Sequence, residues 1–360
     1  GVRLGDASDP RDALAAALAS PGPCLVDVPI AREQNVYPMV PPGAANRDML
    51  DHGTLYVAKF SSDGGGQWVE LSISNAVIAA YTGYAFADQA DVCVNARLAA
   101  DAVGATKMDR PEWCGVNPAN GEIYFTLTNN SNRRLSPTGS QFAPDAANPR
   151  VYSDVKGTTS VSTGNPNGHI IRVREAGNDP AALSFAWDIY LFGSEAGAPS
   201  AINLSGLNGD QDMSSPDGLV FTPSTGICWI QTDDGAYTDV TNCMMLAALP
   251  GAVGDGGVKT ITNTDSTGAT KQVQTYVGAS LGTKLRRFLV GPVECEITGL
   301  AESPDGRALF LNIQHPGEDT AAADIGSPAL FTSHWPDGGA SRPRSATIVI
   351  TRNDGGVIGV

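Results

Sequence analysis

The chain has 360 residues, of which 42% are hydrophobic, so it is long enough for one large domain or two and can bury a packed core. Its 41 glycines and 24 prolines, set against only 17% charged residues, indicate many turns and few long amphipathic helices, which favours an all-β fold. The net charge of −15 repels nucleic-acid backbones and anionic membranes, and it excludes both as partners unless bound cations reverse the local field.

The first 50 residues differ in character from the rest of the chain. The run 12–19 is rich in alanine and leucine, and it follows a possible N-cap at Ser8 or Asp9 and a proline at position 10, so it predicts a short helix. Residues 23–28 have the continuous apolar character of a strand buried in a parallel sheet. No stretch has the pattern of an export signal or of a transmembrane span.

Residues 33–44 have the extended, proline-rich sequence Glu-Gln-Asn-Val-Tyr-Pro-Met-Val-Pro-Pro-Gly-Ala. This segment resembles the C-terminal tail of the acetolactate synthase large subunit, a thiamine-diphosphate enzyme. The segments that bind the cofactor in that family have no counterpart in this sequence, so the resemblance implies no synthase activity. We interpret residues 1–50 as a fusion or misassembly remnant of the α/β type, too small to fold independently, and residues 51–360 as a separate domain.

Downstream, one pattern occurs three times, at residues 110–113, 215–218 and 294–299. Each copy places a carboxylate before a strand and a turn, and β-rich runs follow at residues 122–127, 227–232 and 308–313. A recurring unit of strand, turn and strand at irregular spacing predicts a β-propeller whose blades carry long loop insertions. Equivalent positions on the innermost strands of a propeller face one channel. We therefore expect Glu112, Asp217 and Glu296 to converge there.

Converging carboxylates need cations, and calcium prefers carboxylate oxygens. Glu112 is either a metal ligand or a solvated acid, and the neighbouring Trp113 argues against simple exposure. Asp217 belongs to a Pro-Asp-Gly triplet that is also ordinary turn chemistry, but its register with Glu112 favours a ligand. Glu296 follows Cys295 in a strand-like run, where a buried carboxylate would require a cation or a proton.

Two further residues are candidates for catalysis. Arg110 precedes Glu112 by two positions, so it would face the same side of a strand and could hold a phosphate with two hydrogen bonds, although a surface arginine is the alternative. His315 follows a predicted strand and is suited to metal binding, to proton donation or to capping the turn at residues 316–317. No serine-hydrolase elbow, phosphate loop or zinc-protease motif is present in the sequence.

Residues 51–360 resemble the PhoX family of bacterial alkaline phosphatases in many long segments that follow one another in the family's order. These segments are residues 53–60, 97–106, 108–113, 127–130, 168–172, 215–219, 287–292, 312–318 and 333–339. The resemblance implies a metal-dependent β-propeller that hydrolyses small phosphomonoesters. It also implies that calcium and iron bind Glu112, Asp217 and Glu296. In such an enzyme we expect Arg110 to hold the phosphoryl oxygens.

The resemblance carries expectations about the whole protein as well. Family members have about as much propeller again upstream, so we expect this chain to be a C-terminal fragment that forms a partial propeller. The complete enzyme is expected to be a periplasmic or extracellular monomer. Two alternatives remain open: a propeller that binds calcium without catalysis, and a lactonase-like hydrolase, which also surrounds a channel calcium with acidic residues.

Overall fold

The computed structural model describes residues 2–3, 26–27, 53–157, 159–233 and 239–360. The chain divides into two compact units, Gly1–Leu55 and Tyr56–Val360. In the first unit, β1 (Val2–Arg3) pairs in parallel with β2 (Val26–Asp27), which confirms a parallel strand within residues 23–28. The helix predicted over residues 12–19 and the tail at residues 33–44 lie outside the described residues.

The second unit consists mainly of three sheets, and their strand pairs are antiparallel with one exception among the described residues. The first has the strand order β14-β15-β10-β9-β6-β5, and β4 joins it by pairing with β10 and with β3. Its strands are β3 (Tyr56–Phe60), β4 (Gly65–Glu70), β5 (Pro111–Val116), β6 (Ile123–Leu127), β9 (His169–Glu175), β10 (Ser184–Phe192), β14 (Gly257–Thr264) and β15 (Thr270–Val277). The β10–β15 pair is parallel.

The second sheet contains β11 (Pro216–Phe221), β12 (Cys228–Thr232), β13 (Met244–Ala248) and β16 (Leu285–Val290), and the third contains β17 (Glu296–Glu302), β18 (Ala308–Gln314) and β19 (Ala346–Thr351). A separate hairpin joins β7 (Tyr152–Lys156) to β8 (Ser160–Gly164). The three β-rich runs predicted from the repeat are confirmed as β6, β12 and β18.

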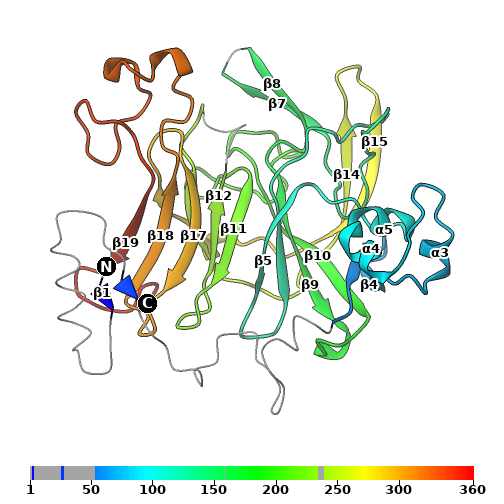
Figure 1. Ribbon diagram of the computed structural model, residues 1–360. Helices are drawn as coiled ribbons and strands as arrows, with labels where there is room; N and C mark the ends of the chain where they lie inside the picture. The colour runs from blue at the N-terminus through cyan, green and yellow to red at the C-terminus, as the bar shows by residue number, and fades with distance from the viewer. Residues whose placement is uncertain (1, 4–25, 28–52, 158, 234–238) are drawn as a thin grey trace. The chain divides into compact units, whose positions relative to one another are not determined.

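The three sheets are arranged as propeller blades. One strand of each blade, namely β5, β11 and β17, lies beside the corresponding strand of the next blade (Figure 1). β5, β11 and β17 are each at an edge of their own sheet, and β11 contacts both of the others. The predicted all-β, propeller-type fold is therefore confirmed. Long connections also match the expectation, because the segment between β18 and β19 contains two short 3-10 turns, η3 (Ala322–Asp324) and η4 (Pro328–Leu330).

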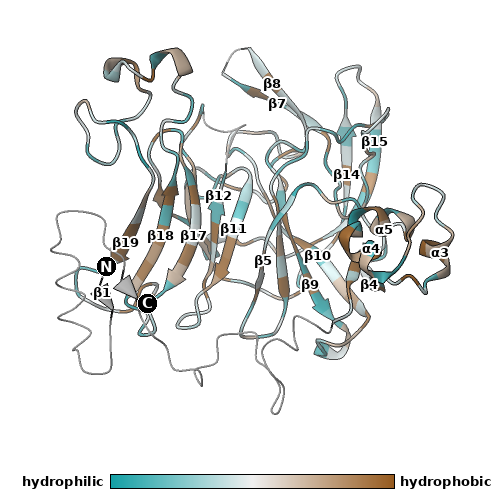
Figure 2. Ribbon diagram, in the orientation of Figure 1, coloured by the Kyte–Doolittle hydropathy of each residue, from teal (hydrophilic) through white to brown (hydrophobic). Residues whose placement is uncertain are grey.

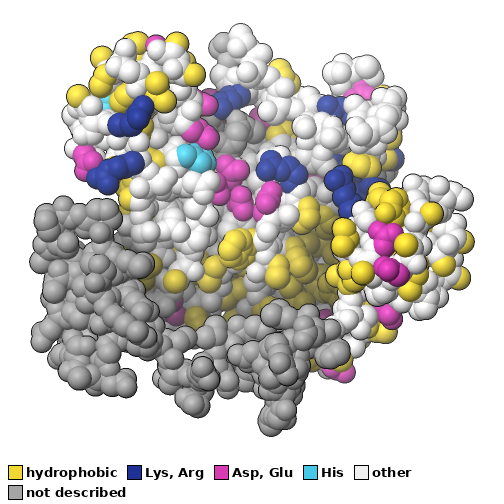
Figure 3. Space-filling model, in the orientation of Figure 1, with side chains coloured by type: hydrophobic (Ala, Val, Ile, Leu, Met, Phe, Trp, Pro, Cys, Tyr) yellow, Lys and Arg dark blue, Asp and Glu magenta, His cyan; other side chains and the backbone are white. Residues whose placement is uncertain are grey.

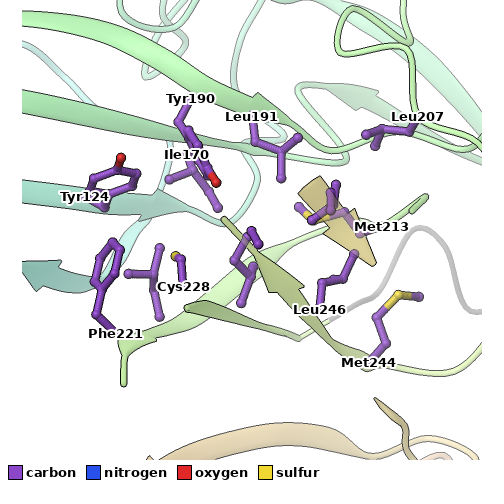
Figure 4. Close-up of a cluster of buried hydrophobic side chains, with 14 residues drawn as sticks. Tyr124, Ile170, Tyr190, Leu191, Leu207, Met213, Phe221, Cys228, Met244 and Leu246 are labelled. Carbon is purple, nitrogen blue, oxygen red and sulfur yellow. The ribbon is translucent and has the colours of Figure 1, made fainter. Parts of the chain in front are cut away.

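The hydrophobic core lies between the blades, and β12 contributes to it on both faces. Cys228 and Ile230 pack into the cluster between the first and second sheets, where Tyr124 and Leu219 also lie (Figure 4). Trp229 points to the opposite side and packs into the cluster shared with the third sheet. Complete burial of such side chains contributes about 1.5–3 kcal/mol each. This packing on both faces fixes the position of β12 between the first and third blades.

Helices make a small contribution. α3 (Ala76–Ala79), α4 (Gln89–Val94) and α5 (Ala96–Ala102) pack around buried Ile78, Val92 and Ala99. Figure 2 shows hydrophobic residues along α5 as well as along β18 and β19. None of the helices among the described residues has the length and apolar character needed to cross a membrane.

Candidate functional site

β5, β11 and β17, which carry the three predicted carboxylates, begin in the same way. The residue two positions before each predicted carboxylate has a left-handed backbone, with φ of 50° at Arg110, 49° at Ser215 and 55° at Glu294. In the first two blades the carbonyl oxygen of this residue accepts a hydrogen bond of 3.1 Å, from Thr128 N to Arg110 O and from Asp233 N to Ser215 O. The blades therefore share one local design at this edge.

The strand pairing at these starts is also equivalent in the first two blades. In both blades the proline before the carboxylate pairs with the last residue of the next strand, and the register then shifts at a bulge. Glu112 and Asp217 are each the second residue of their strand. Thr126 Oγ1 donates a hydrogen bond of 2.6 Å to the carbonyl oxygen of Asp217, and Thr128 Oγ1 donates one of 3.1 Å to that of Pro216. These bonds hold β11 against the first blade.

Arg110 and Glu112 form an ion pair at the surface. Arg110 Nη2 lies 3.3 Å from Glu112 Oε1, and Nη1 donates a hydrogen bond of 3.1 Å to Asn129 Oδ1. The two side chains are 52% and 36% exposed. Trp113 is itself 45% exposed, so the inference that it shields Glu112 from solvent is wrong. The guanidinium is oriented by its partners and still accessible to an anion.

Asp217 is held in a more buried, more acidic environment. Burial raises the pKa of its carboxyl group to about 6, and the negative charges of Glu112 and Asp233 add to the effect, while Arg110 opposes it. Glu112 lies on β5, which contacts β11, and Asp233 N donates to the carbonyl oxygen of Ser215, two residues before Asp217. The carboxylates of the first two blades therefore form one cluster.

Glu296 joins this cluster from the third blade. Burial raises the pKa of its carboxyl group to about 7, followed by the charges of Asp233 and Asp217, and His315 acts in the opposite direction. Gln314 Nε2 donates a hydrogen bond of 2.8 Å to Glu296 Oε2. Figure 3 shows acidic side chains beside a histidine and basic side chains in the middle of this face. The three predicted carboxylates thus occupy one region, at the starts of three neighbouring strands.

His315 lies between two carboxylates. Its Nε2 is 3.5 Å from Glu296 Oε2, and its Nδ1 is 3.2 Å from Glu318 Oε2. The backbone is left-handed here, with φ of 37°, and the backbone N–H donates to Ser345 Oγ at 2.9 Å. The imidazole is therefore positioned at the site's edge, where it can hold or transfer a proton.

Four polar residues of the site were not predicted: Asn129, Asp233, Gln314 and Glu318. Asn129 and Asp233 follow β6 and β12, and Gln314 ends β18, so all three lie at or just after the end of the strand that pairs with a carboxylate-bearing strand. The repeat contained a signal for them, because a polar residue stands at or just after the end of each β-rich run. Glu318 carried no comparable signal, since it lies in an irregular connection.

The donor chemistry of the cluster fits a hard cation. Burial first, and then neighbouring negative charges, raise the pKa values of Asp217 and Glu296. Carboxylate oxygens are the ligands that calcium prefers. Within the part of the chain that the structure describes, however, no three His, Cys, Asp or Glu side chains are arranged as a closed metal site. The carboxylates can contribute to a cation site but do not complete one.

The fold and the site together define a propeller-type protein with a carboxylate-rich centre that includes one arginine and one histidine. The chain belongs to the family of alkaline phosphatase PhoX, whose family model matches residues 32–317. It is also similar to the solved structure of Pseudomonas fluorescens PhoX in complex with vanadate, a transition state analogue, with 35% identity and a TM-score of 0.63. The match covers 87% of this chain and 47% of that one, so this chain spans about half the length of its solved relative.

Short matches to a different protein class were also found. Acetolactate synthase isozyme 1 large subunit of Escherichia coli (strain K12) is 49% identical over 47 residues, which are 13% of this chain and 8% of that protein. The acetolactate synthase large subunit of Parasynechococcus marenigrum (strain WH8102) is 48% identical over 50 residues, 14% of this chain and 8% of that protein. Matches this short indicate a shared segment and carry no function.

Proposed function

We propose that this chain contributes part of the active site of a metal-dependent phosphomonoester hydrolase. The observation that carries the proposal is geometric: equivalent starts of β5, β11 and β17 bring Arg110, Glu112, Asp217 and Glu296 to one region, with His315 at its edge. A guanidinium beside a cluster of carboxylates suits a phosphoryl group whose charge is shared between a protein cation and metal ions. Membership of the PhoX family supports the same activity.

In this proposal Glu112, Asp217 and Glu296 would hold calcium and iron, and these ions would supply positive charge for the phosphoryl group and for an oxygen nucleophile. Arg110 binds the non-bridging oxygens, and its contacts to Glu112 and Asn129 fix its orientation before substrate arrives. His315, placed between Glu296 and Glu318, donates a proton to the oxygen of the departing alcohol.

We further propose that residues 51–360 form the phosphatase part of the chain and that further propeller sequence completes the metal site. The observation that supports this is that the chain covers 47% of the solved relative. The complete enzyme would act as a monomer in the periplasm or outside the cell, as expected from the family.

Binding of a phosphate mimic tests the proposal on the chain itself. Vanadate is titrated calorimetrically into the chain with calcium and iron present, and we expect saturable binding that weakens at least about tenfold in Arg110→Ala. Hydrolysis of p-nitrophenyl phosphate and opening of a γ-lactone are measured in parallel on a complete relative. Lactone opening without phosphate release would favour the lactonase alternative, and calcium binding without vanadate binding would favour a non-catalytic module.

A further inference from the structure

A cavity of about 300 Å³ opens beside His315, within the connection between β18 and β19. One of its walls is apolar and consists of Ile325, Phe331 and Pro343. Arg342 also lines the cavity. Figure 3 shows hydrophobic side chains gathered on the lobe at the upper left, where Figure 1 places this connection, with basic side chains at its lower border.

Hydrogen bonds fix this connection to the start of the third blade. Glu294 Oε2 accepts a hydrogen bond of 3.2 Å from Asp319 N and a second one from Thr332 Oγ1. Thr320 Oγ1 in turn accepts a bond of 3.1 Å from Thr332 N. Asp319 and Thr332, on two separate parts of the connection, are therefore both bound to Glu294, which precedes Glu296 by two positions, and these bonds hold the cavity in shape.

The two arginines of the cavity differ in their partners. Arg344 forms a bidentate ion pair with Asp337, in which Nε donates to Oδ2 at 3.1 Å and Nη2 donates to Oδ1 at 3.0 Å. Arg342 Nη2 donates to the carbonyl oxygen of Ile325 at 3.2 Å, and it has no carboxylate partner among the described residues. Arg342 is thus a positive charge that remains available to a ligand, held in place by the apolar wall.

We propose that this cavity binds the organic group of the phosphoester and prefers an aromatic group that carries a second anionic substituent. The inference rests on the proposed function, because it places the phosphate at Arg110 and the ester oxygen near His315. An aromatic ring would bury its surface against Phe331 and Ile325, and its anionic substituent would pair with Arg342. Aryl and nucleotide-like phosphomonoesters then fit better than short alkyl ones.

Three phosphonates, which the enzyme cannot hydrolyse, separate binding from catalysis: methylphosphonate, phenylphosphonate and 3-carboxyphenylphosphonate. Each is titrated calorimetrically into the chain in calcium-containing buffer. We expect affinity to rise about tenfold from methyl to phenyl, because the ring buries apolar area, and by about a further fivefold with the carboxylate. Phe331→Ala should remove the preference for phenyl, and Ile325→Ala, at an exposed position, should reduce it by the same mechanism.

Arg342→Gln should remove the preference for the carboxylate and leave that for phenyl unchanged. Arg344→Gln is the matched control and should retain both preferences, since its guanidinium is already occupied by Asp337. Equal binding of methylphosphonate and phenylphosphonate to the wild-type chain would overturn the cavity assignment alone. If none of the three compounds binds either to this chain or to a complete relative, the proposed phosphate site is wrong and the cavity assignment fails with it.

Discussion

Arg110 and Ser215 have the same left-handed backbone conformation, with φ of 50° and 49°, two residues before Glu112 and Asp217 respectively. Each carbonyl oxygen accepts a 3.1 Å hydrogen bond from the residue that follows the next strand. A left-handed conformation costs a residue with a Cβ atom about 1–2 kcal/mol. The same costly conformation occurs at two equivalent positions. We infer that it directs the following carboxylate from the sheet edge into the cluster.

The first prediction concerns this turn. Ser215→Gly should be more stable than Ser215→Ala by about 1 kcal/mol, because both variants lose the hydroxyl group but only alanine retains the Cβ atom that opposes a left-handed backbone. Urea denaturation followed by tryptophan fluorescence measures the difference.

Ser214 supplies the control for this comparison, since it is equally buried and its φ is not positive. At that position alanine should be more stable than glycine by about 0.5–1 kcal/mol. The same order of stability at both serines would contradict the backbone argument.

The fold was predictable because its signals are local. The proline and glycine turns at residues 117–121 and 222–226 recur before β-rich runs, and a recurring unit of this kind indicates repeated blades. The left-handed residues were not predictable, because arginine and serine have no preference for that conformation. The exposure of Trp113 also could not be predicted, since the sequence does not show which strands lie at a sheet edge.

The second prediction concerns calcium. Asp217→Asn should abolish most of the rise in melting temperature that calcium produces in the wild-type chain, because the amide lacks the charge that holds the cation. Without calcium at pH 8 the variant should be at least as stable as the wild type. The reason is that burial and Glu112 raise the pKa of Asp217 to about 6, so its ionised form destabilises the folded state above that pH.

Asp305→Asn is the matched control for calcium binding. Asp305 is the middle residue of a second Pro-Asp-Gly triplet, at residues 304–306. Its Oδ1 accepts from Ser303 Oγ at 2.7 Å and from Arg307 N at 3.2 Å within its own turn. Differential scanning fluorimetry with and without calcium compares the variants. A calcium-induced shift of wild-type size in Asp217→Asn would remove Asp217 from the site.

The third prediction concerns catalysis in a full-length relative that carries the equivalent residues. The Glu112→Gln equivalent should lower kcat for p-nitrophenyl phosphate by about 100-fold or more, because the side chain keeps its shape but loses its charge. The Arg110→Ala equivalent should mainly raise KM and weaken inhibition by phosphate. Steady-state kinetics distinguish the two effects, and an unchanged kcat in the glutamine variant would leave Glu112 as a surface acid paired with Arg110.

The site could be predicted only in part, because its members depend on different kinds of information. Glu112, Asp217 and Glu296 belong to a repeat that is visible in the sequence. Asp233 stands at the position where the first blade has Thr128. The two residues donate equivalent backbone hydrogen bonds, but their side chains differ in charge. Glu318 approaches His315 across a turn of three residues in an irregular connection, where the sequence shows no repeated pattern.

The last prediction concerns the buried His169 on β9. Its Nε2 lies 2.9 Å from the carbonyl oxygen of Ala147, to which it donates, and its Nδ1 lies 3.0 Å from Asn165 Nδ2, from which it accepts. A second ring proton would meet the Asn165 amide instead of an acceptor. Burial, reinforced by the charge of Arg150, lowers the pKa of His169 to about 3. The folded state therefore keeps this ring neutral.

An unfolded histidine has a pKa of about 6.5, so between pH 6.5 and 3 the unfolded chain binds a proton that the folded chain does not. The stability that depends on neutral His169 is complete above pH 6.5 and decreases as the pH falls. From pH 7 to pH 5 the loss should be about 2 kcal/mol. Urea denaturation at both pH values should show a smaller loss in His169→Gln than in the wild type, by about that amount. His334→Gln, in the connection between β18 and β19, serves as the control and should keep the wild-type loss. An equal loss in the wild type and in His169→Gln would mean that His169 is not the source of the acid sensitivity.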